Sequence, residues 1–196
     1  MVLTFWCKFV YAVDISKPSL QKATDLFVKL DITEKTKVIS GDGLEQLKAD
    51  EVDDVIIAGL GSDTIEQIIS KCGWLKNPDK RLILVPGSRH RQLREFIYLN
   101  GFEIIKERAV FEKGHSYTVM NAGYTGKSRT ITPVFAELGR IPEFDGDKKE
   151  YINAVYLRVR NIIERAKTAS SIAADKISDA RQTVSYIEKL YEEYVG

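Results

Sequence analysis

Residues 38–69 read VISGDGLEQLKADEVDDVIIAGLGSDTIEQII, and this stretch decides the fold class. Two short apolar runs rich in β-branched residues, Val38–Ser40 and Val55–Ala58, each end in a turn that contains glycine. Continuous apolar runs of this kind are typical of strands buried on both faces, as in a parallel sheet that helices cover. Ligands bind outside the carboxyl ends of the strands in such sheets. The sequence therefore places a candidate site at the turns 41–43 and 59–62.

A further strand and helix are predicted on the amino-terminal side of this stretch. Val10–Val13 reads as a buried strand that ends at Asp14. Ser16-Lys17-Pro18 then opens a helix, because proline is tolerated in the first helical turn. Its apolar residues recur at helical spacing up to Leu30, so one face of this helix is expected to cover the sheet.

On the carboxyl-terminal side, strands and helices continue to alternate. Asp63, followed by Glu66 three residues later, gives a capping-box pattern for one helix, and Ser88 is the predicted cap of the next. Strands are predicted at 81–85, 102–111 and 117–124. The order β-α-β-(short helix)-β-α-β-α-β-β predicts an α/β fold whose sheet is mostly parallel, with antiparallel last strands.

Residues 148–196 have a different pattern. Their apolar residues follow alternating steps of three and four, with one break in phase, as in a coiled coil. We expect this segment to fold back near residues 168–171, so that each half buries its apolar seam against the other. The predicted organisation is a sheet domain at 1–125, a connector with one helical turn at 126–147, and a helical coiled-coil tail at 148–196. The repeating positions are Ile152, Val155, Val159, Ile162, Ala166, Ala169, Ala173, Ile177, Ala180, Val184, Ile187, Tyr191 and Tyr194.

Composition narrows the class of protein. The 196 residues carry a formal net charge of +1, so any polyanion-binding surface must come from local clusters. Cys7 and Cys72 lack metal-ligand spacing, which predicts free thiols in a reducing cytoplasm and no metal site. No apolar run reaches the roughly 20 residues that span a bilayer, so no membrane association is expected. A monomer is the expected oligomeric state.

The strand ends carry residues suited to a nucleoside. Asp14 can accept hydrogen bonds from the two hydroxyls of a ribose. Asp42 can accept from an adenine amino group, and Gly43 allows a base to approach the backbone. The loop Gly59-Leu60-Gly61-Ser62 can bring main-chain groups close to a ligand. Each residue has an alternative reading as an ordinary helix cap or turn residue, but their combination on three successive strands favours a nucleoside-bearing ligand.

Three segments in this order resemble the bacterial tRNA (adenine(22)-N(1))-methyltransferase family, also called TrmK. They are GDGLEQL, VDDVIIAGLGSDTIEQII and the run from RLILVPGSRH to EKGHSYTV, and the similarity extends through AVDISKPSLQKA and into the tail. The resemblance implies a Rossmann-like class I methyltransferase fold, S-adenosylmethionine as methyl donor, and N1 of a tRNA adenine as acceptor. The chain is thus expected to be a cytoplasmic, RNA-binding enzyme of tRNA modification and processing.

The resemblance also implies which residues bind the donor. Asp14 matches the acidic ribose-binding position, with Ile15 beside it, and Asp42 and Gly43 match the adenine-side turn. The loop that faces donor and target base corresponds to Ala58, Gly59, Leu60 and Gly61. No catalytic residue can be named, because orientation of the adenine dominates in this chemistry.

Two departures from the family pattern affect these expectations. Family members have a strand ending in D-I-G-S-D-H before the Asp14 strand, where this chain reads MVLTFWCKF. We therefore expect an amino-terminally truncated or remodelled member, with weak or absent donor binding and little methylation. They also read Met-Gly-Gly in place of Leu60-Gly61-Ser62, and Gln-Pro-Asn in place of Val85-Pro86-Gly87, so a carboxamide that could grip an adenine edge is missing here.

Two basic clusters are candidates for RNA contact. Residues 76–94 hold six lysines and arginines against one aspartate, and residues 148–181 hold eight against four acidic residues. Solvated helix faces explain such clusters equally well, whereas phosphate contact would make them functional. The candidate RNA-binding residues are Arg89, Arg91, Arg94, Arg158, Arg160 and Arg165.

The sequence thus favours a tRNA adenine-N1 methyltransferase that uses S-adenosylmethionine. The first alternative is a non-catalytic tRNA- or RNA-binding protein derived from a methyltransferase, which the missing D-I-G-S-D-H segment favours. The second is a nicotinamide-dependent enzyme, which is disfavoured because no G-x-G-x-x-G follows any predicted strand.

Overall fold

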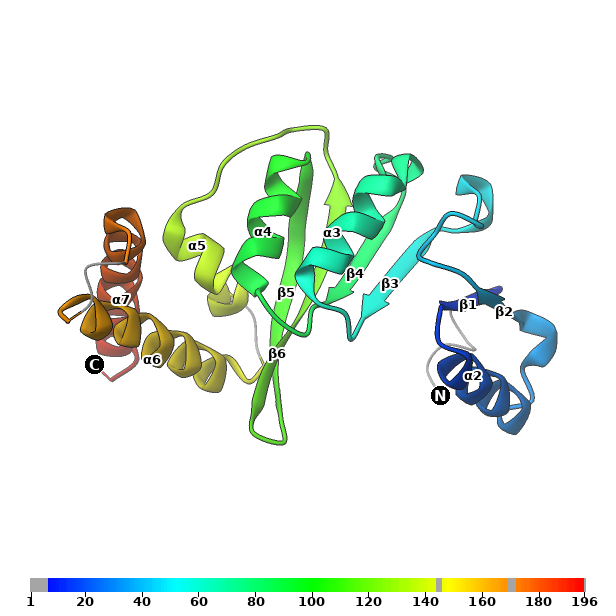
Figure 1. Cartoon of the computed structure of the whole chain (residues 1–196), viewed down its shortest axis with the longest axis horizontal. Coiled ribbons are helices and arrows are strands. Elements are labelled where there is room, and N and C mark those ends of the chain that lie inside the picture. The colour runs from blue at the N-terminus through cyan, green and yellow to red at the C-terminus, as the bar shows by residue number, and fades with distance from the viewer. Residues whose placement is uncertain (1–6, 144–145, 169–171, 196) are drawn as a thin grey trace.

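The computed structural model describes residues 7–143, 146–168 and 172–195, and it confirms the predicted order of strands and helices (Figure 1). Short 3-10 turns occur at Thr33–Lys35, Ala49–Glu51, Gly73–Leu75 and Ile141–Glu143, and the second of these is the predicted short helix. The strands are β1 (Val10–Asp14), β2 (Thr36–Ser40), β3 (Asp54–Ala58), β4 (Arg81–Val85), β5 (Phe102–Glu112) and β6 (His115–Tyr124). The helices are α2 (Lys17–Lys29), α3 (Ser62–Lys71), α4 (His90–Leu99), α5 (Pro133–Leu138), α6 (Lys148–Ala166) and α7 (Ala174–Val195).

The strands form two separate sheets. The larger has the order β3-β4-β6-β5, in which β3 and β4 are parallel and β6 is antiparallel to both of its neighbours. The smaller consists of β1 and β2, paired in parallel. In Figure 1, β1 lies on the side of this pair that faces β3. Among the described residues, no strand pairs with the edges of β1 and β3 that face each other.

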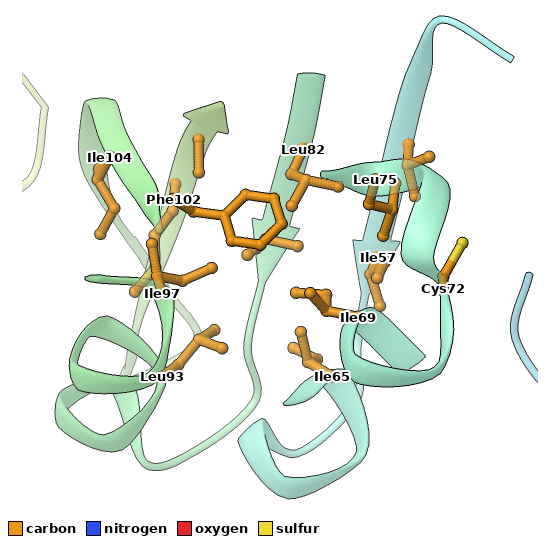
Figure 2. Close-up of a cluster of buried hydrophobic side chains, with 14 of the residues drawn as sticks. Ile57, Ile65, Ile69, Cys72, Leu75, Leu82, Leu93, Ile97, Phe102 and Ile104 are labelled. Atoms are coloured by element: carbon orange, nitrogen blue, oxygen red, sulfur yellow. The ribbon is translucent and has the colours of Figure 1, made fainter. Parts of the chain in front are cut away.

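The main core lies between the larger sheet and helices α3 and α4 (Figure 2). Apolar residues on one face of each helix meet alternate residues of the strands, as the helical and strand periodicities require. Ile65 and Ile69 project from α3, and Leu93 and Ile97 from α4. The side chains that they meet on the sheet include Ile57, Leu82, Phe102 and Ile104.

A buried ion pair connects this core to the carboxyl-terminal helices. Arg94 of α4 has no exposed surface and donates to Glu107 of β5, with Nη2–Oε1 at 2.7 Å. It also donates to the main-chain oxygens of Ala136 and Glu137 at 2.8 Å and to the hydroxyl of Tyr151 at 2.9 Å. A guanidinium so fully paired fixes α5 and α6 against the sheet.

Helices α6 and α7 pack against each other, as the predicted folding back of the tail requires. The predicted turn itself lies partly outside the described residues. Five repeating positions, Ile152, Val155, Val159, Ala180 and Ile187, are buried in a second apolar cluster. The predicted helical turn in the connector is confirmed as α5. The coiled-coil packing of α6 and α7 stays a prediction, and so does the division of the chain into domains.

The amino-terminal layer of β1, α2 and β2 buries much less apolar surface. None of the residues of α2 is buried, and Leu26 and Val28 are largely exposed. In the whole layer from Val10 to Ser40, Ile39 is the one buried apolar residue. A two-stranded sheet with so little packing is marginally stable by itself.

Candidate functional site

A cavity of about 470 Å³ opens where β1 and β3 face each other, and it extends to the carboxyl ends of both strands. Strands that end at one edge of a parallel sheet predict that Asp14, Asp42 and Gly59 share one pocket; the two aspartates do line this cavity, but Gly59 does not. Six of the eight predicted donor-binding residues are among its lining: Asp14, Ile15, Asp42, Gly43, Ala58 and Leu60. Gly59 and Gly61 do not line the cavity, although both lie next to residues that do.

Asp14 is held in place at the end of β1. Its main-chain oxygen accepts from the Gly41 amide at 3.2 Å, which extends the β1–β2 pairing by one step. Its carboxylate Oδ1 accepts from the Ser16 amide at 2.7 Å. This bond orients a half-buried carboxylate at the rim of the cavity, where it remains able to accept further hydrogen bonds from a polyol.

Asp42 and Gly43 form the turn after β2. The Asp42 side chain is 71% exposed, and its Oδ2 lies 3.8 Å from the Lys71 ammonium, so it remains accessible to a ligand. Gly43 has φ +79°, and a Cβ there would lie 3.2 Å from Ile68 of α3. Glycine is therefore required at this turn by both its left-handed backbone and its contact with α3.

The loop at 59–62 is joined by hydrogen bonds to the loop that follows β4. The Gly59 amide donates to the Val85 oxygen at 3.1 Å, and the Gly87 amide donates to the Leu60 oxygen at 2.9 Å. Gly59 has φ +76°, and a Cβ added there would meet nothing within 4 Å. Glycine at this position therefore serves the left-handed turn and not a close packing contact.

Ser62 ends the predicted 59–62 loop, but the role of its side chain was not predicted from the sequence. Its side chain is fully buried, and its Oγ is within hydrogen-bonding distance of the main-chain oxygens of Ser88, at 2.6 Å, and Arg89, at 3.0 Å. Arg89 has φ +55°, an uncommon conformation for a residue with a side chain. The only signal in the sequence was the serine where the resembling family has glycine.

These contacts correct two predicted helix caps. The predicted capping box of Asp63 and Glu66 is wrong, because α3 begins at Ser62 with Gly61 as its cap residue. Asp63 instead accepts from Gln92 and Arg89, which lowers the pKa of its carboxyl. The predicted cap at Ser88 is also wrong, since α4 begins at His90 with Arg89 in the cap position.

The candidate RNA-binding arginines divide into three groups. The prediction that Arg94 contacts RNA is wrong, because its side chain is fully buried and paired with Glu107. Arg91 is one-third exposed and paired with Glu95, Glu137 and Asp179. Arg89, Arg158, Arg160 and Arg165 all expose their side chains, although Arg158 also pairs with the buried Glu137.

A second hollow, of about 390 Å³, lies between α4, α6 and α7. Three of the candidate arginines line it, namely Arg89, Arg91 and Arg158. Acidic residues of the same lining, Glu137 and Asp179, pair with Arg91 and Arg158. The hollow is therefore a balanced charged surface and not a purely basic one.

Metal and membrane sites were also sought within the described ranges. No three histidine, cysteine, aspartate or glutamate side chains there are grouped so that they could hold a metal ion. No helix in those ranges is long and apolar enough to cross a membrane.

The family described as "methyltransferase domain" matches residues 1–120, which is more than half of the chain. The chain therefore belongs to the methyltransferase domain family, with a Rossmann-like sheet. A curated relative, the tRNA (adenine(22)-N(1))-methyltransferase of Bacillus subtilis (strain 168), is 28% identical over 165 residues, covering 84% of this chain and 67% of the relative.

Two solved structures have the same fold. One is TrmK from M. capricolum in complex with S-adenosylhomocysteine, with a TM-score of 0.69 and 24% identity over 94% of this chain and 81% of that one. The other is a protein of the NADB-Rossmann superfamily from Streptococcus agalactiae, with a TM-score of 0.69 and 21% identity. The match covers 91% of this chain and 81% of that one. The predicted fold class is confirmed.

Proposed function

We propose that this chain is an S-adenosylmethionine-dependent methyltransferase that acts on N1 of an adenine in tRNA. The observation that carries the proposal is that Asp14, Asp42, Ala58 and Leu60 line one cavity in a chain of the methyltransferase domain family. The Bacillus subtilis relative is named for N1 of adenine 22 in tRNA. A tRNA substrate also implies a cytoplasmic protein, and we expect it to act as a monomer.

The residues present suit the adenosine half of the donor. Asp14 would accept from the two ribose hydroxyls, because its carboxylate is already oriented by the Ser16 amide. Asp42 would accept from the adenine amino group, and Gly43 lines the same cavity beside it. A cavity of about 470 Å³ is in the range of small-molecule sites.

When bound, S-adenosylmethionine supplies a methyl group on a positively charged sulfur. The contribution of this chain is to orient the acceptor. N1 of adenine has a free lone pair, so no side chain needs to remove a proton to create the nucleophile. The joined loops at 59–62 and 86–89, held by Ser62, offer a fixed wall against which a base can be oriented.

The exposed arginines of α6 are the proposed phosphate contacts. Arg160 and Arg165 project from this helix and are exposed, whereas Arg94 is excluded by its burial. Exchanging Arg160 and Arg165 for glutamate should weaken tRNA binding. The slope of the logarithm of the affinity against the logarithm of the salt concentration should fall by the amount expected for roughly one to two lost phosphate contacts. Lys22→Glu with Lys29→Glu on α2 changes the net charge equally and serves as the control. Equal effects of the two pairs in filter binding would point to net charge alone.

The activity itself is tested by transfer of a labelled methyl group to tRNA transcripts. The donor is supplied at millimolar concentration, so that the assay also detects transfer from a weakly bound donor. Asp14→Asn should slow transfer by at least about tenfold, since a hydrogen bond to a charged group contributes about 1.5–3 kcal/mol. Asp25→Asn on the exposed face of α2 is the matched control and should leave the rate unchanged.

The acceptor is tested with a transcript in which adenine 22 is replaced by guanine, which should receive no methyl group at that position. Transfer that is unaffected by this change would refute the acceptor assignment. If tRNA binds but receives no methyl group at any donor concentration, the chain is a non-catalytic RNA-binding protein and the proposal is wrong. Equal rates for the Asp14 and Asp25 variants would refute the ribose site.

A further inference from the structure

Three neighbours hold the loop 86–89, which follows β4 and leads into α4; we call it the acceptor loop. From the side of the cavity, the Leu60 oxygen accepts from the Gly87 amide at 2.9 Å. From α3, the buried Ser62 hydroxyl lies within hydrogen-bonding distance of two main-chain oxygens of the loop. The third neighbour is helix α6 of the tail, and its contact with the loop has no role in the proposed function.

His90, the first residue of α4, makes the contact with α6. Its ring stacks on the ring of Tyr151 at a centroid distance of 5.9 Å and an interplanar angle of 14°. Its Nδ1 lies 3.3 Å from the Tyr151 hydroxyl. The main chain of Pro86, the first residue of the acceptor loop, also interacts with the imidazole. One side chain therefore connects both ends of the loop to helix α6.

Tyr151 is itself held in place. It is 4% exposed, and its hydroxyl accepts from Arg94 Nη2 at 2.9 Å. Arg94 is fully buried and paired with Glu107 of β5. The ring against which His90 packs is therefore anchored to the sheet through a buried network, in which each member fixes the next.

The charges around His90 keep its ring neutral. Burial and the guanidinium of Arg94 lower the pKa of His90 to about 4, and Arg158 of α6 acts in the same direction. The Glu107 carboxylate opposes this shift without reversing it. His90 is therefore neutral throughout the pH range of a transfer assay, and its contact with Tyr151 is the same in all of that range.

A second contact joins the first turn of α4 to the tail. Arg91 Nη2 lies 2.6 Å from Asp179 Oδ2 of α7, and so α4 is bound to both tail helices. Along α6, Tyr151 lies in the first turn, whereas the proposed phosphate contacts Arg160 and Arg165 lie in the second half. The same helix thus touches the start of α4 with one end and presents exposed arginines at the other.

We propose that helix α6 positions the acceptor loop through His90, so that the tail acts on the transfer step as well as on RNA binding. His90 is a positioning residue, which acts through the loop and not through contact with the adenine. A small displacement of such a loop misorients the bound base and slows transfer. This inference rests on the proposed function, because it concerns the same acceptor site.

Kinetics of methyl transfer separate the two roles of the tail. His90→Ala removes the ring, and kcat at saturating tRNA should fall by at least about tenfold, while tRNA affinity in filter binding changes by less than about twofold. His90→Phe keeps a ring that can stack on Tyr151 and should recover part of the lost rate. Exchanging Arg160 and Arg165 for glutamate should have the opposite effect, with weaker binding and little change in kcat.

A matched variant controls for loss of stability. Ile187 of α7 is fully buried in the second apolar cluster, so Ile187→Ala weakens the packing of the tail but leaves the His90 ring and the acceptor loop as they are. It should lower the urea midpoint, whereas kcat should stay within about twofold at a temperature where both variants are folded. If circular dichroism shows that His90→Ala is unfolded, His90→Gln replaces it, because glutamine removes the ring and keeps much of the volume.

Hydrogen exchange tests the position of the loop without donor or tRNA. The Gly87 amide is bonded to Leu60, so its exchange reports whether the loop keeps its place. Exchange in residues 86–89, measured by mass spectrometry, should be at least about tenfold faster in His90→Ala and unchanged in Ile187→Ala. This measurement stays informative if the chain transfers no methyl group, so a failure of the proposed function and a failure of this inference are told apart.

Three results would overturn the inference. The first is unchanged exchange of the acceptor loop in His90→Ala. The second is weaker tRNA binding in that variant with an unchanged kcat, which would place His90 in RNA binding alone. The third is an equal loss of kcat in His90→Ala and Ile187→Ala, since stability alone would then explain the effect.

Discussion

The two ends of the larger sheet differ in how they are joined to the rest of the molecule. At the β5 end, Arg94 and Glu107 are fully buried and connect the sheet to α5 and α6 through several hydrogen bonds. At the β3 end, the edge faces a cavity, and the layer beyond it has a helix with no buried residue. The proposed donor anchors Asp14 and Asp42 lie in this weakly packed layer, so the least stable part of the fold sets their geometry.

Removing one partner of the buried ion pair should have the largest effect. Arg94→Met leaves the Glu107 carboxylate buried without its charge partner, which costs about 3–5 kcal/mol of unfolding free energy. Exchanging both residues for methionine should recover only part of this loss, because the oxygens of Ala136 and Glu137 and the hydroxyl of Thr118 would lose these hydrogen-bond partners. Urea denaturation measures both variants. A loss under about 1 kcal/mol in the single variant would show that the pair does not hold this end together.

Equivalent leucine truncations on two helices compare the ends directly. Leu93 of α4 is completely buried, so Leu93→Ala should cost about 2–5 kcal/mol. Leu20 of α2 is only half-buried, and Leu20→Ala should cost less than about 1 kcal/mol. Both values come from urea midpoints measured under the same conditions. Similar losses for the two variants would contradict the contrast in packing.

A smaller effect is expected from His90, at the start of α4. Its ring stacks on Tyr151 at a centroid distance of 5.9 Å, and burial lowers the pKa of the imidazole to about 4. The folded state therefore binds this proton less readily than the unfolded state, whose pKa is about 6.5. The contribution of the neutral His90 ring to the free energy of unfolding is fully present above about pH 6.5. It declines as the pH falls toward 4, because the unfolded state then binds the proton more tightly.

Between about pH 7.5 and about pH 5, His90 should account for a loss of about 2 kcal/mol in unfolding free energy. His90→Gln should reduce this pH dependence, whereas His115→Gln, at an exposed position on the β5–β6 hairpin, should not. Urea denaturation at the two pH values gives the comparison. An unchanged slope in the His90 variant would mean that its imidazole is protonated equally in both states.

The strands could be predicted from the sequence because their apolar runs are short and end in glycine turns, as at Gly43 and Gly59. The convergence of Asp14 and Asp42 followed from the rule that parallel strands end at one edge. The burial of Arg94 could not be predicted, since its partner Glu107 lies on a strand whose position is set only by the tertiary fold. Ser62 was missed for the same reason, because its acceptors lie more than twenty residues later.

Native-state hydrogen exchange measured by mass spectrometry tests the contrast between the two ends most directly. We predict that amides of β1, α2 and β2 exchange through low-energy openings, while those of β4, β6 and α4 exchange only on global unfolding. Equal protection of β1 and β4 in the free chain would contradict the account, because the amino-terminal layer would then be as firmly held as the core.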